Sequence, residues 1–294
     1  MEREIKMKKI PILLLFLVLI SQGCIADNDS SFIIEVGNKP NQLGYTVGVE
    51  LSSGPIAITE FEDEVLILDK VNYKVNIYST SGKFVTYKKI PKELVYKDIA
   101  VNPRNKDIML LTDKGIFAIK DDKVNKIYDL PNIISLPYYF YIDKYGTIGI
   151  TGLNDEGRLK SGIYNSEGVY TELKGVSVFL SYSGMRCLQT TNKEVVLTER
   201  EKFIKRFTIN IQGFMTPIGI SDDMSIYCVE PIKNGIILYR IDKNGKMINK
   251  KINYSSRLIG DPADIIRFIR VTQKSEIIGL EVNPKECRVL KIKI

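Results

Sequence analysis

The chain of 294 residues contains no histidine and no tryptophan. Without histidine it cannot form a Ser-His-Asp triad, a Cys-His dyad or a zinc site with imidazole ligands. Without tryptophan it lacks one common platform for stacking sugar rings, although its 16 tyrosines can still supply flat aromatic faces. The most familiar hydrolase and zinc-enzyme chemistries are therefore excluded.

Phosphate-binding glycine loops are also missing, because neither GxxxxGK[ST] nor GxGxxG occurs in the sequence. Clustered carboxylates do occur, at residues 62–64, 121–122 and 222–223. Such clusters can bind Ca²⁺ or act as general acid and base, but aspartate is also common in tight turns for local reasons. We interpret these clusters as turn residues, and we expect no metal ion and no other cofactor.

Cysteine is scarce, with four residues in the whole chain. Cys187, Cys228 and Cys287 lie in apolar, strand-like runs at separations of 41 and 59 residues, which match no metal-binding spacing. A buried free cysteine behaves as a small hydrophobic residue. We therefore predict that these three cysteines pack in the core.

Helical periodicity is nearly absent after the N-terminal segment, and short apolar runs rich in Val, Ile, Tyr and Phe alternate with turn residues. The stretch VNIYSTSGK (75–83) recurs as SGIYNSEGV (161–169) and LYRIDKNGK (238–246). Each copy places a glycine after three polar residues, where a positive φ lets the chain reverse tightly. These glycines are Gly82, Gly168 and Gly245. A weaker copy, IFAIKDDKV (116–124), lacks the glycine, which indicates a different turn type there.

The repeated stretch belongs to a longer unit that reads strand, turn, strand, loop, strand, turn, strand. The second strands of six such units are expected to begin at residues 65, 108, 148, 195, 226 and 277, at spacings of 43, 40, 47, 31 and 51 residues. A period near 40 built from four strands is typical of a propeller blade. The sequence therefore predicts an all-β fold, a six-bladed β-propeller of four-stranded antiparallel blades over residues 32–294. The alternative is a double β-sandwich.

The two ends of the repeat array support a closed ring. The last unit begins near Asp264 and contains only three strand-like runs, whereas SFIIEVG at residues 31–37 belongs to no other unit. We predict that residues 32–36 pair beside residues 288–294 and supply the missing fourth strand. Such pairing joins the two ends of the chain and removes exposed strand edges.

These repeats resemble the six-bladed propeller family that includes NHL-repeat and TolB-like proteins and, within it, bacterial propeller lipoproteins. Their shared motif is a strand followed by D/N/T-x-x-G-K and a second strand. The resemblance implies that ligands bind at one mouth of the central channel, on loops between blades and at the starts of inner strands. The candidate ligand-binding residues on that surface are Arg257, Asp261, Arg267, Arg186 and Tyr139. Tyr139 belongs to the aromatic run PYYFYID, for which packing between blades is the other interpretation.

The first 23 residues read as a secretory signal. A basic start, MEREIKMKK, is followed by nine apolar residues at 12–20 and then by small residues. Nine residues rise about 14 Å in a helix, roughly half of the hydrocarbon core, so we do not expect a membrane-spanning helix. The stretch ISQGC (20–24) resembles a bacterial lipoprotein signal. The resemblance implies cleavage before Cys24, lipid attachment at Cys24 and a short tether over residues 24–31. The alternative is a plain secretory signal with an incidental cysteine.

The lipoprotein resemblance implies a protein that is lipid-anchored to a membrane in the cell envelope, on the extracytoplasmic side. Its charge is uneven, because residues 231–294 hold 14 basic and 6 acidic residues while the whole chain has a net charge of +7. A basic end can attract acidic polymers or an anionic membrane surface, or can simply be a solvated face. No dense run of Lys and Arg occurs, and we expect no nucleic-acid partner.

The sequence favours a ligand- or protein-binding module over a catalyst, with a small molecule, a glycan or another protein as the partner. Two alternatives remain. One is a lyase or hydrolase that uses Tyr, Arg, Lys and carboxylates at the channel mouth. The other is a scaffold for envelope assembly.

Overall fold

The computed structural model describes the backbone of residues 29–48, 52–173, 177–184, 186–190, 194–199, 202–208, 215–255 and 262–294. Side chains are described over the same ranges, except for residues 186–190, 194–199, 202–208 and 262–263. The predicted signal peptide and Cys24 lie outside the described residues. In the described part of the chain, no helix is long and apolar enough to cross a lipid bilayer.

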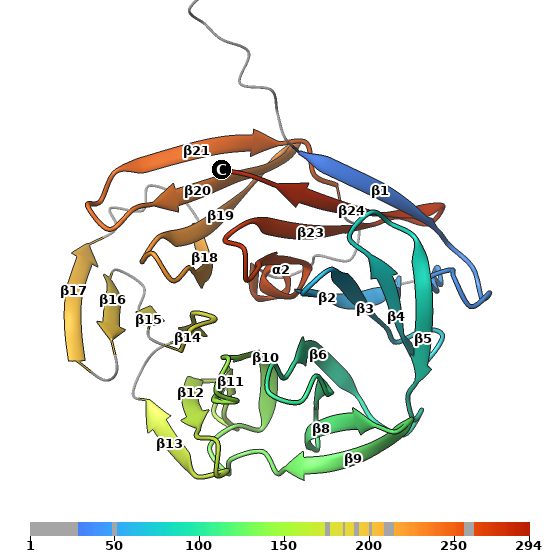
Figure 1. Cartoon of the computed structure of the whole chain (residues 1–294), viewed down its shortest axis with the longest axis horizontal. Coiled ribbons are helices and arrows are strands. Elements are labelled where there is room, and N and C mark those ends of the chain that lie inside the picture. Colours follow the sequence, from blue (N-terminus) through green and yellow to red (C-terminus); the bar gives the residue numbers. More distant parts are fainter. Residues whose placement is uncertain are drawn as a thin grey trace, which may run out of the picture.

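The strands form six four-stranded antiparallel sheets around a central axis (Figure 1), and we call each sheet a blade. Blade 1 contains β2 (Pro55–Phe61), β3 (Glu64–Asp69), β4 (Lys74–Ser79) and β5 (Phe84–Lys89). Blade 2 contains β6 (Tyr96–Val101), β7 (Ile108–Thr112), β8 (Gly115–Lys120) and β9 (Lys123–Tyr128). Blade 3 contains β10 (Leu136–Ile142), β11 (Ile148–Leu153), β12 (Leu159–Tyr164) and β13 (Tyr170–Leu173).

Blade 4 contains β14 (Ser177–Leu180), β15 (Arg186–Thr190), β16 (Glu194–Glu199) and β17 (Lys202–Thr208). Blade 5 contains β18 (Thr216–Ile220), β19 (Ile226–Ile232), β20 (Gly235–Ile241) and β21 (Met247–Ile252). Blade 6 contains β22 (Ile269–Val271), β23 (Ile277–Val282), β24 (Glu286–Ile292) and, as its outer strand, β1 (Ser30–Glu35). The fold is therefore a β-propeller with one sheet for each predicted repeat unit.

The predicted pairing of the two chain ends is confirmed. β1 pairs antiparallel with β24, with Phe32 opposite Val289 and Ile34 opposite Cys287. The strand begins at Ser30, two residues earlier than predicted, so the end of the expected tether belongs to the sheet. Blade 6 is thus completed by the N-terminus, as the three-stranded last unit of the sequence predicted.

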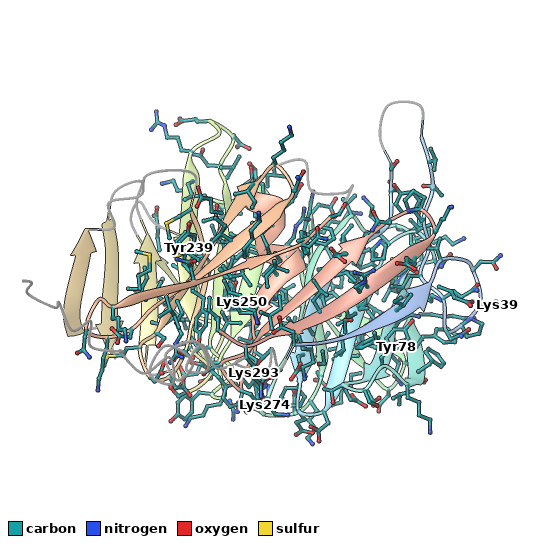
Figure 2. All side chains as sticks on the ribbon, turned by 90° about the horizontal axis from the view of Figure 1, so that it is seen from above. Lys39, Tyr78, Tyr239, Lys250, Lys274 and Lys293 are labelled. Atoms are coloured by element: carbon teal, nitrogen blue, oxygen red, sulfur yellow. The ribbon has the colours of Figure 1, made fainter. Side chains whose placement is uncertain are left out.

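The segment after β1, residues 37–44, lies over the edge of blade 1 and is called here the N-terminal clamp. Side chains of β4 hold its main chain. Lys74 Nζ donates to the carbonyl of Lys39 at 2.8 Å, and the Tyr78 hydroxyl donates to the carbonyl of Asn41 at 2.9 Å. Figure 2 shows Lys39 and Tyr78 at the same side of the molecule. The N-terminal segment therefore connects blade 6 to blade 1 and closes the ring.

Blade 4 corrects one detail of the predicted repeat. The sequence interpretation took the run at Val195 as a second strand, but β16 is the third strand of its sheet and β15 is the second. The error arose because β14 has only four residues and gives too little periodicity to be recognised. The true second strands begin at residues 64, 108, 148, 186, 226 and 277, at spacings of 44, 40, 38, 40 and 51. Only the last spacing remains long, because α2 (Pro262–Phe268) is inserted between blades 5 and 6.

The recurring glycine motif is a self-capped turn. Asp242 Oδ1 accepts the N–H groups of Asn244 and Lys246 at 2.8 and 2.9 Å, and Gly245 between them has φ +85°. Gly82 and Gly168 occupy equivalent positions, with φ +88° and +82°. The predicted role of the three glycines is therefore confirmed. In the copy without glycine, Asp121 and Asp122 both have positive φ, 49° and 58°, which is the pattern of a type I′ turn.

Two of these glycines should respond differently to replacement by alanine. At Gly245 an added Cβ would meet nothing within 4 Å, so Gly245→Ala should cost only the backbone strain, about 1 kcal/mol. At Gly82 the added Cβ would lie 2.6 Å from Phe32 Cγ on β1, so Gly82→Ala should cost clearly more. Urea unfolding of both variants measures the difference. Equal losses would mean that Phe32 moves aside freely.

The core packs between neighbouring blades. Cys228 and Cys287 are both fully buried free thiols, and burial raises the pKa of each to about 12. Their predicted role as core residues is confirmed, whereas the side chain of Cys187 lies outside the described residues. Thiols held in this way are protonated at neutral pH and take no part in nucleophilic chemistry.

Candidate ligand-binding site

The centre of the ring is crossed by a buried ion pair. Arg270 on β22 contacts the carboxylate of Asp98 on β6 and donates from Nη1 to the carbonyl of Ile99 at 3.3 Å. Asp98 also accepts the N–H of Phe140 on β10 at 3.0 Å. The arginine is 4% exposed and the aspartate is completely buried. This axial ion pair therefore connects blades 6, 2 and 3.

The surroundings of the axial ion pair leave little room for a ligand. Burial raises the pKa of Asp98, and the charge of Arg270 and the Phe140 amide act in the opposite direction. The adjacent cavity has a volume of only about 80 Å³ and is lined in part by Glu60 and Tyr141. A water molecule occupies about 30 Å³ in the liquid, so this space suits two or three waters. We interpret the axial ion pair as a structural feature.

Helix α2 lies at the centre of the ring (Figure 1), where it contacts the inner strands of blades 1, 3 and 5. Asp264 in its first turn and Arg267 in its last turn form an ion pair and also suit the helix dipole. Arg267 Nη1 further donates to the carbonyl of Lys97 at 3.1 Å. Since Arg267 and Arg270 both reach β6, they hold α2 across the channel.

A cavity of about 470 Å³ opens beside α2, between blades 1 and 2. Its walls come from the segment before β2, the β3–β4 turn, the β5–β6 connection, the start of β6 and α2. We call it the basic pocket, and its lining residues are Ser52, Ser53, Gly54, Ile56, Lys70, Tyr73, Lys92, Leu94, Val95, Tyr96, Lys97, Asp264, Arg267 and Phe268. It combines an apolar, aromatic floor with four cationic side chains, and volumes of this size hold small ligands.

The basic pocket has an excess of positive charge. The pKa of Lys70 is lowered first by burial and then by Arg267 and Lys97, and the pKa of Lys97 is lowered by burial and by Arg267. Asp264 opposes both shifts but is already paired with Arg267, and Asp113 also opposes the shift of Lys97. Among the ion pairs of the described residues, neither lysine takes part within 4 Å. An anion in the pocket would therefore relieve an existing repulsion.

The predicted site residues are only partly placed together. Arg267 lines the basic pocket, whereas Arg257 and Asp261 lie outside the described residues, and of Arg186 only the backbone on β15 is described. Tyr139 is 2% exposed and stacks on Phe179 at 5.5 Å, and burial raises its pKa to about 12. Its position agrees with the packing role that the sequence also allowed.

The three lysines of the pocket were missed by the sequence interpretation. Lys70 follows a second strand, Lys92 lies between two blades and Lys97 begins an inner strand. In a propeller these positions share one face, because the chain returns to that face between second and third strands and between blades. Cations at equivalent ends of neighbouring units are therefore the feature of the sequence that points to this pocket.

Comparisons with known proteins support the fold. The sequence matches no known protein family and no curated protein. Virginiamycin B lyase from Staphylococcus aureus, in a catalytically inactive histidine-to-alanine form, superposes with a TM-score of 0.53 at 15% identity, over 90% of this chain and 100% of that one. A gluconolactonase from Xanthomonas campestris gives 0.54 at 9% identity, over 89% and 98%. TolB from Acinetobacter baumannii gives 0.54 at 12% identity, over 76% and 60%.

Identities this low establish the architecture and nothing more. The lyase structure shows that catalysis there is abolished when a histidine is replaced, and this chain has no histidine to correspond to it. The gluconolactonase and TolB likewise share only the arrangement of blades. The chain is a β-propeller whose structural neighbours include enzymes as well as TolB.

Proposed function

We propose that this protein is a membrane-anchored, extracytoplasmic binding module that holds an anionic ligand in the basic pocket. The observation that carries the proposal is the pair Lys70 and Lys97, two half-buried cations that line one cavity together with Arg267 and form no ion pair among the described residues. Holding such cations close together is electrostatically unfavourable, and a bound anion would offset that repulsion. Arg267 adds a planar donor group that suits a carboxylate or a phosphate.

Binding is favoured over catalysis by the state of the carboxylates. Asp98 is buried and held by Arg270, beside a cavity of about 80 Å³. Asp264, the carboxylate that lines the basic pocket, is paired with Arg267. Neither group is free to exchange protons with a substrate, so the geometry supports retention of a ligand and offers no described acid–base pair for its conversion.

Anchoring through Cys24 is compatible with access to the basic pocket. The described chain enters the domain at Asp29, which pairs with Lys250 at 2.8 Å and accepts the N–H of Lys293 at 3.3 Å. Lys250 lies on β21, the outer strand of blade 5, and Lys293 follows β24, which pairs with the outer strand β1. The pocket lies instead beside α2 at the centre of the ring (Figure 1). A lipid at Cys24 would therefore attach the protein by its rim and leave the pocket open.

Citrate is a suitable compact polyanion for testing the pocket. The double variant Lys70→Gln/Lys97→Gln should bind citrate at least tenfold more weakly than the wild type, because each lost charge contact with an anion is worth about 1 kcal/mol or more. The matched control is Lys123→Gln/Lys285→Gln, which alters two exposed lysines outside the pocket, one at the start of β9 and one between β23 and β24. Titration calorimetry measures both. Citrate binding that is absent in the wild type, or equal in the two double variants, would refute the assignment.

The same interaction should depend on pH. Citrate is essentially fully ionised above about pH 8, so any change in affinity there reports on the protein. Because the pKa values of Lys70 and Lys97 lie below the usual 10.5, their charges are lost at lower pH than those of ordinary lysines. Affinity should therefore fall as the pH rises toward 10, and binding near pH 9 should take up protons. Calorimetry in buffers of different ionisation enthalpy measures that uptake, and proton release would contradict the prediction.

The proposed anchor has its own test. In a bacterial host that processes lipoproteins, the wild-type protein should partition into the detergent phase and incorporate radiolabelled palmitate. Cys24→Ala should abolish both, because the site of lipid attachment is lost and two or more acyl chains are needed for stable anchoring. The variant Cys287→Ala serves as the control, since that thiol is buried in the core. Unchanged partitioning of Cys24→Ala would exclude a lipid anchor at this residue.

A further inference from the structure

The basic pocket continues outward across blade 1. A second cavity of about 380 Å³ lies between the N-terminal clamp and the outer part of the blade. Its lining includes Lys74, Tyr87 and Lys89, and it shares Tyr73 and Lys92 with the basic pocket. Because the two cavities share these two side chains, they lie next to each other, and we call them together the blade 1 groove. It runs from α2 at the centre of the ring to β5 at the rim.

The blade 1 groove is positively charged along its whole length. Lys70, Lys97 and Arg267 lie at the inner end, Lys92 in the middle and Lys89 at the outer end. Of all the residues that line the two cavities, Asp264 is the single carboxylate, and it is paired with Arg267. The spacing of cations along a path suits a ligand with several anionic groups in series.

Tyrosine rings alternate with these cations. Lys92 Nζ lies 5.4 Å from the centre of the Tyr73 ring, and Lys74 Nζ lies 5.7 Å from the centre of the Tyr87 ring. Lys74 is also committed to main-chain carbonyls of the N-terminal clamp. A flat apolar surface beside a cation matches a sugar ring that carries a carboxylate, because the ring packs on the aromatic face while the carboxylate meets the charge.

The main chain around the blade 1 groove offers little to a peptide. The N–H of Ile90 donates to Tyr73, that of Ser53 donates to Thr46, and that of Val95 donates to the Asp113 carboxylate. An extended peptide gains much of its affinity from unpaired backbone groups at a sheet edge. Since these groove amides are already paired, recognition must come from side chains, which suits a sugar chain better than a polypeptide.

We propose that the blade 1 groove binds an acidic polysaccharide, a chain of carboxylate-bearing sugars that extends from α2 to β5. This inference rests on the proposed function, because the basic pocket is the inner end of the groove. Each cavity alone has the size of a small-ligand site, so the two in succession accommodate several linked sugars. Binding by successive sugars predicts an affinity that grows with chain length until the groove is filled.

Galacturonate oligomers of one to eight sugars test the proposal by titration calorimetry on the full-length chain. Affinity should rise at least tenfold between one and six sugars and then level off, and neutral oligosaccharides of equal length should not bind. The variant Lys89→Gln/Tyr87→Ala, altered only in the outer groove, should bind the hexamer about tenfold more weakly. It should bind citrate with at most a twofold change. Lys123→Gln/Lys285→Gln should bind both ligands as the wild type does.

The outcomes separate the two proposals. Normal citrate binding together with an affinity independent of oligomer length would overturn the groove and leave the pocket standing. Absence of citrate binding in the wild type would remove the pocket itself. Hexaglutamate that binds more tightly than the hexamer of galacturonate would overturn the polysaccharide assignment and identify an acidic peptide as the ligand.

Discussion

Replacing Asp98 by alanine should lower the free energy of unfolding by about 3–5 kcal/mol. The change leaves the Arg270 guanidinium, which is 4% exposed, without its counter-ion. It also leaves the Phe140 amide without the acceptor it has at 3.0 Å. Both consequences fall where three blades meet, so the loss affects the closure of the ring and not one blade alone. Urea unfolding followed by circular dichroism measures the effect.

The control for this prediction is an exposed ion pair. Asp129 pairs with Lys126 at 2.6 Å, but its side chain is 84% exposed, so Asp129→Ala should cost less than about 1 kcal/mol. A double replacement, Asp98→Leu/Arg270→Met, should be more stable than Asp98→Ala, because it removes the unpaired charge as well. If Asp98→Ala were as mild as the control, the axial ion pair would not be what holds the three blades together.

The parts of the fold that were predictable depend on local sequence. Each strand is marked by alternating or continuous apolar residues, and each tight turn by a capping side chain such as Asp242 followed by Gly245. The closure of blade 6 was predictable for a different reason. The last unit lacked one strand and the N-terminal strand belonged to no other unit, so the N-terminal strand was expected to complete the last sheet. Where the local signal weakened, at the four residues of β14, the assignment of strands within the blade failed.

Helix α2 was not predictable from its own residues. Its seven residues, PADIIRF, make two turns, and a helix of that length is not stable alone in water. It exists here because Ile265, Ile266 and Phe268 are buried against the inner strands. The sequence therefore indicated a long connection between blades 5 and 6 but gave no sign that the connection would occupy the channel.

The site also depends on contacts between distant parts of the chain. Arg270 and Asp98 are 172 residues apart, and Arg267 reaches the carbonyl of Lys97 across a separation of 170. No local pattern pairs such residues, because their proximity follows from the circular arrangement of blades. The position of Arg267 in a connection between blades made it a candidate from the sequence. Lys70 and Lys97 are recognised as part of a site only from the structure, where they line one cavity with residues of α2.

The second large effect is expected at Asp69, whose replacement by alanine should cost about 3 kcal/mol of unfolding free energy. The side chain is completely buried, and Oδ2 accepts the N–H of Gly44 at 2.8 Å and Asn72 Nδ2 at 3.0 Å. Oδ1 accepts the N–H groups of Val71 and Asn72, both at 3.1 Å. Alanine leaves all four donors without this acceptor in a buried site.

Because Gly44 belongs to the N-terminal clamp, Asp69→Ala should also loosen the end of the chain that closes the ring. Cleavage by chymotrypsin after Leu43 should become faster, since Leu43 is completely buried while the clamp lies on blade 1. The control is Asp242→Ala, which removes the acceptor for two amides in an exposed turn and should cost about 1 kcal/mol without exposing Leu43. If Asp69→Ala lost stability without faster cleavage at Leu43, the clamp would be held by β4 alone, and Asp69 would act only within its own turn.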